Sequence, residues 1–216
     1  HEKLQYLEAF YELGLMEIDW KMEGVGEGDE KTLLEQFFRV GNVFRQLPEA
    51  SQVIIADITQ RMGAGMAEFV QIDLGQGTVT IEDYNHYCHY VAGLVGEGLS
   101  RLFTASGHES ELVADVSTTL ANTMGLFLQK TNIIRDSLED YGDGRAFWPQ
   151  EIWKGYTSSG ELGELAKPEC RGRAVECLNH LVTDALQCVP ECLQYMTLLH
   201  QEEVFRFCAI PQVMAI

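Results

Sequence analysis

The stretch that decides the fold is residues 124–140, MGLFLQKTNIIRDSLED. Most of it is apolar, yet Gln129, Asn132, Asp136 and Asp140 recur at offsets of three and four residues. Side chains at these offsets lie on one face of an α-helix. We therefore predict an apolar helix that carries a polar stripe along one side.

Helical periodicity continues on both sides of this stretch, and strand-like alternation is nowhere sustained. Thr80 followed by Asp83 resembles a capping box, which predicts a long helix from about Ile81 towards Phe103. The next helix is expected from about 112 to 140. Earlier helical patterns cover residues 4–15, 33–40 and 53–66. Segments rich in glycine or other turn formers separate the helices at residues 23–29, 74–77, 141–144 and 157–168.

The chain length indicates one domain, and the helical periodicity indicates an all-α bundle of roughly eight helices. The chain has 216 residues, of which 46% are hydrophobic, and this is long enough for a sizeable core.

A net charge of -18 repels a phosphate backbone and excludes nucleic acid as a partner. The six cysteines come without a signal peptide and favour a reducing compartment. No apolar run is long enough to span a bilayer.

The end of the polar stripe is acidic. Asp136, Glu139 and Asp140 could present three carboxylates to one point, where their repulsion calls for a cation. Magnesium suits such a site, because it takes one or two carboxylates and leaves its other positions to water and substrate phosphates. A magnesium site of this kind predicts that the protein binds a diphosphate. The alternative is a solvated helix end whose acidic residues simply face water.

Two arginines flank this cluster, and guanidinium groups bind phosphate in a two-pronged manner. Arg135 and Arg145 are therefore candidates to hold a leaving diphosphate, together with Gln129 and Asn132; the alternative for the arginines is salt bridges to the same carboxylates.

The predicted helix from 81 to 103 carries an apolar stripe that includes Tyr87, Val91 and Val95. A tyrosine in such a stripe is usually packed in the core, so a catalytic Tyr87 is the minority interpretation from pattern alone. Gly93, Gly96 and Gly98 interrupt the helix, which indicates close approach by a neighbour or a ligand. Their spacing is not that of a dinucleotide-binding turn after a strand.

Four stretches together resemble the squalene synthase family, in the order in which that family carries them. They are YCHYVAGLVG at 87–96, MGLFLQKTNIIRD at 124–136, FWPQE at 147–151 and FCAIPQVM at 207–214. The likeness is dense from about Ser51 to Ile216 and weak before it.

The resemblance implies the isoprenoid synthase fold, in which two aspartate-rich motifs hold magnesium and diphosphate. It implies that two farnesyl diphosphates condense to presqualene diphosphate, which NADPH then reduces to squalene. Tyr87 matches the tyrosine assigned to proton transfer in the first half-reaction, and Phe207 the aromatic that shields carbocations in the second. The metal ligands would be Asp136, Glu139 and Asp140, and the substrate pocket Val91, Val95, Met124, Gly125, Leu128, Cys208 and Pro211.

Two other functions stay open. A relative of the phytoene synthase type shares the fold and the first half-reaction but has no hydride step. A catalytically inactive helical scaffold would have no use for Tyr87 and the acidic cluster. Residues 147–150 and Leu94-Val95 favour the reductive enzyme.

The chain departs from the family in three places. The first aspartate-rich motif is not found, and Glu17 and Asp19 do not reproduce it. No C-terminal membrane anchor follows, and Arg206 stands where the family carries asparagine. We expect a monomeric catalytic domain truncated at both ends, inactive on its own, whose complete form is anchored in the endoplasmic reticulum membrane and faces the cytoplasm.

Overall fold

The computed structural model describes residues 9–115 and 117–215, and these residues contain helices and loops but no strand. They belong to two compact units, which divide between Val70 and Gln71. The prediction of an all-α protein is confirmed. The described residues form more helices than the roughly eight predicted, because turns break several periodic segments into short pieces.

The first unit contains the π-helix η1 (Tyr11–Met16) and the helices α2 (Gly28–Glu35), α3 (Phe38–Phe44) and α4 (Glu49–Val70). Aromatic rings of Phe10, Trp20 and Phe37 meet edge to face, with centroids 5.1 to 5.6 Å apart. The helical patterns at 33–40 and 53–66 fall on α2, α3 and α4; residues 4 to 8 of the first pattern lie outside the described residues.

The second unit begins with the predicted long helix, which runs as α5 (Ile81–Cys88), the π-helical η2 (His89–Gly93) and α6 (Leu94–Ala105). The capping box at its start is confirmed: the Asp83 N–H donates to the Thr80 hydroxyl and the Thr80 N–H donates to the Asp83 carboxylate, both at 3.0 Å. This reciprocal pairing satisfies two amide groups that would otherwise lack partners.

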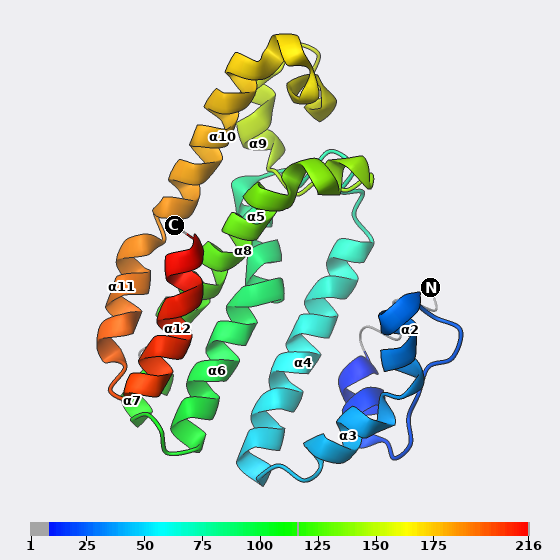
Figure 1. Cartoon of the computed structure of the whole chain (residues 1–216), viewed down its shortest axis with the longest axis vertical. Coiled ribbons are helices and arrows are strands. Elements are labelled where there is room, and N and C mark those ends of the chain that lie inside the picture. The colour runs from blue at the N-terminus through cyan, green and yellow to red at the C-terminus, as the bar shows by residue number, and fades with distance from the viewer. Residues whose placement is uncertain (1–8, 116, 216) are drawn as a thin grey trace. The chain divides into compact units, whose positions relative to one another are not determined.

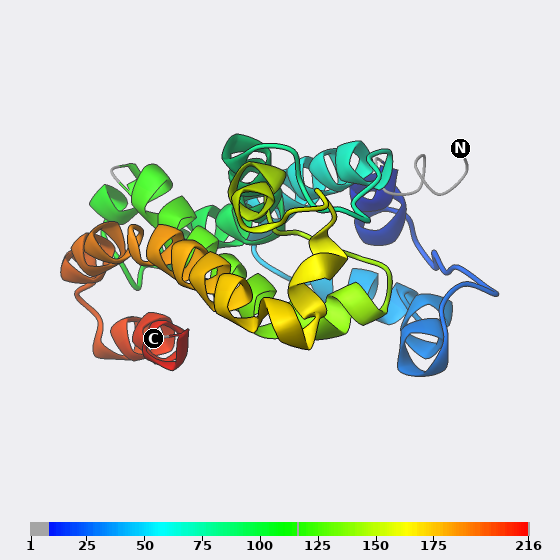
Figure 2. The same ribbon diagram turned by 90° about the horizontal axis from the view of Figure 1, so that it is seen from above.

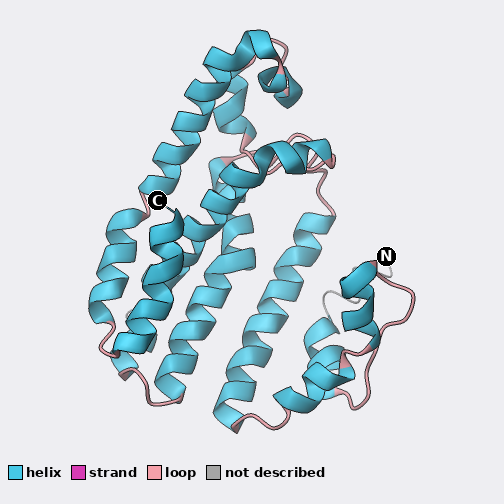
Figure 3. Ribbon diagram, in the orientation of Figure 1, coloured by secondary structure: helices cyan, strands magenta, loops and turns pink. Residues whose placement is uncertain are grey.

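The helix with the polar stripe is α8 (Ser117–Gly142), preceded by the short α7 (Glu111–Asp115). It contacts α5, η2, α6, α10, α11 and α12, and Figure 1 shows these helices gathered beside it. The remaining elements are α9 (Gln150–Trp153), η3 (Lys154–Tyr156), η4 (Leu162–Ala166), η5 (Pro168–Cys170), α10 (Arg171–Leu186), α11 (Val189–Leu198) and α12 (Glu202–Ala215). Figure 2 shows α10 and α11 following one another along α8, and Figure 3 shows helices and loops but no strand in the part of the chain that the structure describes.

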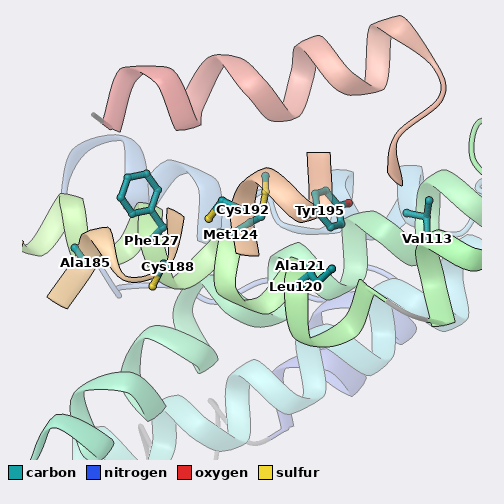
Figure 4. Packing of buried hydrophobic residues seen from close by; sticks show 9 residues of the cluster. All are labelled: Val113, Leu120, Ala121, Met124, Phe127, Ala185, Cys188, Cys192 and Tyr195. Atoms are coloured by element: carbon teal, nitrogen blue, oxygen red, sulfur yellow. The ribbon is translucent and has the colours of Figure 1, made fainter. Parts of the chain in front are cut away.

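The main core of this unit lies where α8 meets α7, α10 and α11. Figure 4 shows its side chains, Val113, Leu120, Ala121, Met124, Phe127, Ala185, Cys188, Cys192 and Tyr195. Cys188 and Cys192 are among them, so both thiols serve the core packing. Within it, the Lys130 ammonium donates to the Asp184 carboxylate at 2.7 Å, which ties α8 to α10. None of the six cysteines forms a disulfide.

Glycines allow α8 to pack closely against η2 and α6. A methyl group on Gly96 would overlap the carbonyl oxygen of Ala121, and one on Gly93 the side chain of Asn122. Gly125 faces the carbonyl of Ala92 in the same way. Close approach by a neighbouring helix, predicted for Gly93 and Gly96, is confirmed. No helix within 9–115 and 117–215 is long and apolar enough to cross a bilayer.

Candidate functional site

The acidic end of α8 is occupied by arginines. Arg135 donates from two nitrogens to both carboxylate oxygens of Asp136, at 2.6 and 2.7 Å. This pairing holds the pKa of the Asp136 carboxyl below its ordinary value. A guanidinium nitrogen of Arg145 lies 3.2 Å from an oxygen of Asp140. The salt bridges considered as the alternative role of both arginines are therefore present.

The three carboxylates do not meet at one point as the spacing predicted. Among the residues that the structure describes, no three His, Cys, Asp or Glu side chains lie close enough to hold a metal. Asp136 and Asp140 instead each face a separate guanidinium. The donor set still fits magnesium, because that ion needs only one or two carboxylates when a diphosphate supplies further oxygens.

Tyr87 lies in the last turn of α5 and is buried. Its ring stacks on Phe147, with centroids 4.8 Å apart and planes inclined by 25°. Burial raises the pKa of the Tyr87 phenol to about 12; the thiol of Cys88 and the carboxylate of Asp140 add to this rise. The guanidinium of Arg145 acts in the opposite direction. Tyr87 is thus a packed residue, as the pattern indicated, and also lies within electrostatic reach of the acidic end of α8.

A cavity of about 360 Å³ opens beside the same stripe of α8. Its walls come from η2, α6, α8, α11 and α12, and they are mainly apolar. The lining residues include all seven predicted for a substrate pocket and also Gln129, Asn132 and Phe207. Sequence reasoning thus selected residues from three separate helical segments that the structure brings to one cavity.

The polar stripe leads out of this cavity. Gln129 and Asn132 line it, and Asp136 follows Asn132 by four residues, one helical turn farther along the same face. Asp140 follows after another turn. The arrangement joins an apolar cavity to an acidic helix end, which suits a ligand with a hydrocarbon tail and an anionic head once a cation neutralises the carboxylates.

Some lining residues carried no signal in the sequence. Tyr195 reaches the cavity from α11, where its hydroxyl pairs with that of Ser100 at 2.7 Å. Gln212 reaches it from α12 and donates its amide to the carbonyl of Met124 at 3.3 Å. Val95, which was predicted for the pocket, is 41% exposed and lines the cavity.

Comparison with known proteins places these features in a family. The squalene/phytoene synthase family model matches residues 5–216. Squalene synthase of Homo sapiens is 50% identical over 215 residues, which is all of this chain and 49% of the relative. Squalene synthase 1 of Arabidopsis thaliana is 47% identical over 218 residues, again all of this chain and 51% of the relative.

Solved structures agree with the sequence relatives. The complex of TcSQS with the ligand BPH1237 superposes with a TM-score of 0.92 at 46% identity, over 99% of this chain and 61% of that one. The predicted isoprenoid synthase fold is confirmed. The chain spans about half the length of the curated relatives it matches. Since the family model matches nearly every residue, the chain belongs to the squalene/phytoene synthase family.

Proposed function

We propose that the full-length protein is a squalene synthase. It would join two farnesyl diphosphates head to head into presqualene diphosphate and reduce this intermediate to squalene with NADPH. The observation that supports this most is the apolar cavity of about 360 Å³ whose polar side leads along α8 to Asp136 and Asp140. Relatives at about half identity that are named squalene synthases support the same activity.

Substrate binding would begin at the acidic end of α8. Asp136 and Asp140, with Glu139, would hold magnesium, which supplies positive charge to a departing diphosphate. Arg135 and Arg145 now pair with two of these carboxylates, and the same guanidinium groups would turn to the diphosphate when it arrives. Gln129 and Asn132 would donate amide hydrogens to it from the cavity wall.

Tyr87 would move a proton in the first half-reaction. With a pKa near 12 it carries its proton at neutral pH, so it serves as a neutral donor or relay and not as a phenolate base. The closing of the cyclopropane ring releases a proton from carbon, and the leaving diphosphate is an acceptor to which the phenol could pass it. Stacking on Phe147 holds the ring in place for this transfer.

The second half-reaction passes through carbocations, which water would destroy. The apolar walls of the cavity would keep water from the cation once the substrate fills it, and the face of Phe207 would offer a cation–π contact. NADPH would supply the hydride. The described residues contain no strand-to-helix turn of the kind that binds dinucleotide phosphates, so we assign no residue of this chain to that cofactor.

Product analysis separates this function from its rivals. The full-length protein would be incubated with farnesyl diphosphate and magnesium, with and without NADPH. Squalene that forms only with NADPH supports the proposal. A hydrocarbon product that does not depend on NADPH would point to the phytoene synthase type, and absence of any product to a noncatalytic scaffold.

We also propose that the full-length protein acts as a monomer with a single catalytic domain at the endoplasmic reticulum membrane, facing the cytoplasm. The family resemblance supports this location, and sedimentation together with protease protection of isolated microsomes would test it. A lumenal domain or a stable dimer would contradict it.

A further inference from the structure

A buried carboxylate lies outside the site described above. Glu109 is in the turn between α6 and α7, and its side chain has no exposed surface. Its oxygens accept hydrogen bonds from the backbone N–H of His200, at 3.0 Å to each oxygen, and from that of Gln201 at 2.9 Å. A buried carboxylate is tolerated only when such donors satisfy it.

The two amide groups that Glu109 accepts from belong to the turn directly before α12. The carboxylate therefore acts on α12 as an N-terminal cap supplied by a distant part of the chain, about 90 residues away in sequence. Negative charge at this end of a helix is also favoured by the helix dipole. The bonds join the end of α6 to the beginning of α12.

Val204 and Gln212 of α12 are buried, and the ring of Phe207 meets Phe103 of α6 edge to face, with centroids 6.1 Å apart. Two polar contacts add to this packing, one near each end of α12. Glu109 provides the charged tie at the beginning, and the amide of Gln212 provides the other.

The tie at the beginning of α12 lies close to the cavity wall. Phe207 and Cys208 follow Gln201 by six and seven residues, which is about 10 Å along a helix that rises 1.5 Å per residue. A shift at the first turn of α12 would move both side chains relative to α6 and α8. Phe103 and Glu109 both approach α12 from the end of α6, so they set the position of Phe207 together.

The geometry points to Glu109 as a positioning residue: it holds α12 against the end of α6 and so keeps Phe207 over the cavity. Glu109 itself lines no part of the cavity and touches no reacting group. The inference rests on the proposed function in one respect, namely that Phe207 serves the carbocation half-reaction. A loosened α12 should admit water to that step and affect the first step much less.

The variant Glu109→Gln tests this in the full-length protein. It keeps the shape of the side chain but removes its charge. Only one oxygen then remains to accept hydrogen bonds from the two backbone N–H groups. Glu111→Gln is the matched control, since Glu111 is an exposed carboxylate two residues farther along the chain, in the first turn of α7. Amide exchange in peptides covering 200–208 should rise about 10- to 100-fold in Glu109→Gln, the range for losing a charged hydrogen bond.

Peptides from α8 and α10 serve as the internal reference in the same measurement, and their exchange should stay unchanged. A uniform rise across the domain would show that Glu109 contributes only to overall stability and would overturn the positioning role. Unchanged exchange at 200–208 would overturn it as well.

The second measurement is the ratio of products that the enzyme releases. With magnesium and NADPH, Glu109→Gln should release more presqualene diphosphate and more alcohols, which form when the carbocation combines with water and loses a proton. The rate of the first half-reaction should stay within about threefold of wild type. An unchanged partition would overturn the role. If wild type itself makes no squalene, the proposed function falls, and the exchange measurement still decides whether Glu109 holds α12.

Discussion

A guanidinium nitrogen of Arg145 lies 3.2 Å from a carboxylate oxygen of Asp140, and the backbone N–H of Arg145 donates to the carbonyl of the same residue at 2.9 Å. The loop after α8 thus folds back onto the last carboxylate of the polar stripe. In this structure a guanidinium provides the positive charge that a metal would otherwise supply. If Asp140 binds magnesium as proposed, the metal would compete with this contact, and the released guanidinium would become available to an anion.

Asp140→Asn should weaken magnesium-dependent diphosphate binding, because one charged oxygen ligand is lost. We expect at least about a tenfold rise in the magnesium concentration needed for half-maximal turnover. Asp143→Asn is the matched control, since Asp143 also pairs with Arg145, at 3.3 Å, but is not among the predicted ligands. Equal magnesium titrations for wild type and Asp140→Asn would refute the assignment.

Tyr87→Phe should preserve the fold, because the ring and its stacking on Phe147 remain. The rate of presqualene diphosphate formation should fall about 10²- to 10⁴-fold, the usual contribution of a group that transfers a proton. Rapid-quench assays of the first half-reaction would measure it. Tyr90→Phe removes a hydroxyl three residues along the same helical run and is the control. A near-normal rate in Tyr87→Phe would leave Tyr87 as a core residue only.

Wild type and Tyr87→Phe should also differ in how their free energy of unfolding changes at alkaline pH. Burial raises the pKa of the folded Tyr87 from 10.0 to about 12, so the unfolded chain loses this proton first. Between these two pKa values the wild type should lose free energy of unfolding as pH rises, and Tyr87→Phe should lack this part of the loss. Urea unfolding at pH 9 to 11 would measure the free energy of unfolding of both proteins. If this free energy falls equally with pH in wild type and Tyr87→Phe, Tyr87 is not buried as described.

Phe207→Ala should damage the second half-reaction more than the first. The rate of squalene formation from presqualene diphosphate should fall about 30-fold, since a desolvated cation–ring contact is worth about 2 kcal/mol. Phe205→Ala is the control, because Phe205 lies on the same helix but does not line the cavity. Equal losses in both half-reactions would indicate a packing defect instead of a role for the ring.

Gly96→Ala should destabilise the protein, because its methyl group would overlap the carbonyl of Ala121 where α6 packs on α8. We expect a loss of about 1–3 kcal/mol in the free energy of unfolding, measured with urea. Gly172→Ala on α10 has open space around it and should be neutral or stabilising by up to about 1 kcal/mol. If both variants behave alike, close packing at Gly96 is not what holds these helices together.

The sequence by itself determined the helices and their faces. The spacing of Gln129, Asn132, Asp136 and Asp140 places them on one side of α8, and the pairing of Thr80 with Asp83 marks where α5 begins. These features depend on neighbours within one or two turns, so they can be read from adjacent residues. The residues predicted for the pocket came from the family resemblance, and the structure gathers all of them in one cavity.

Tertiary structure alone decided which faces meet and which charges pair. Nothing near Glu109 in sequence indicates that it accepts from His200, and nothing near Tyr87 indicates its stacking on Phe147. The orientation of Arg145 towards Asp140 depends on how the loop after α8 returns. The described carboxylates do not gather at one point, although their spacing on the helix had indicated it. The physical reason is that local periodicity fixes the direction of a side chain on its helix, whereas the partner it meets depends on the packing of distant segments.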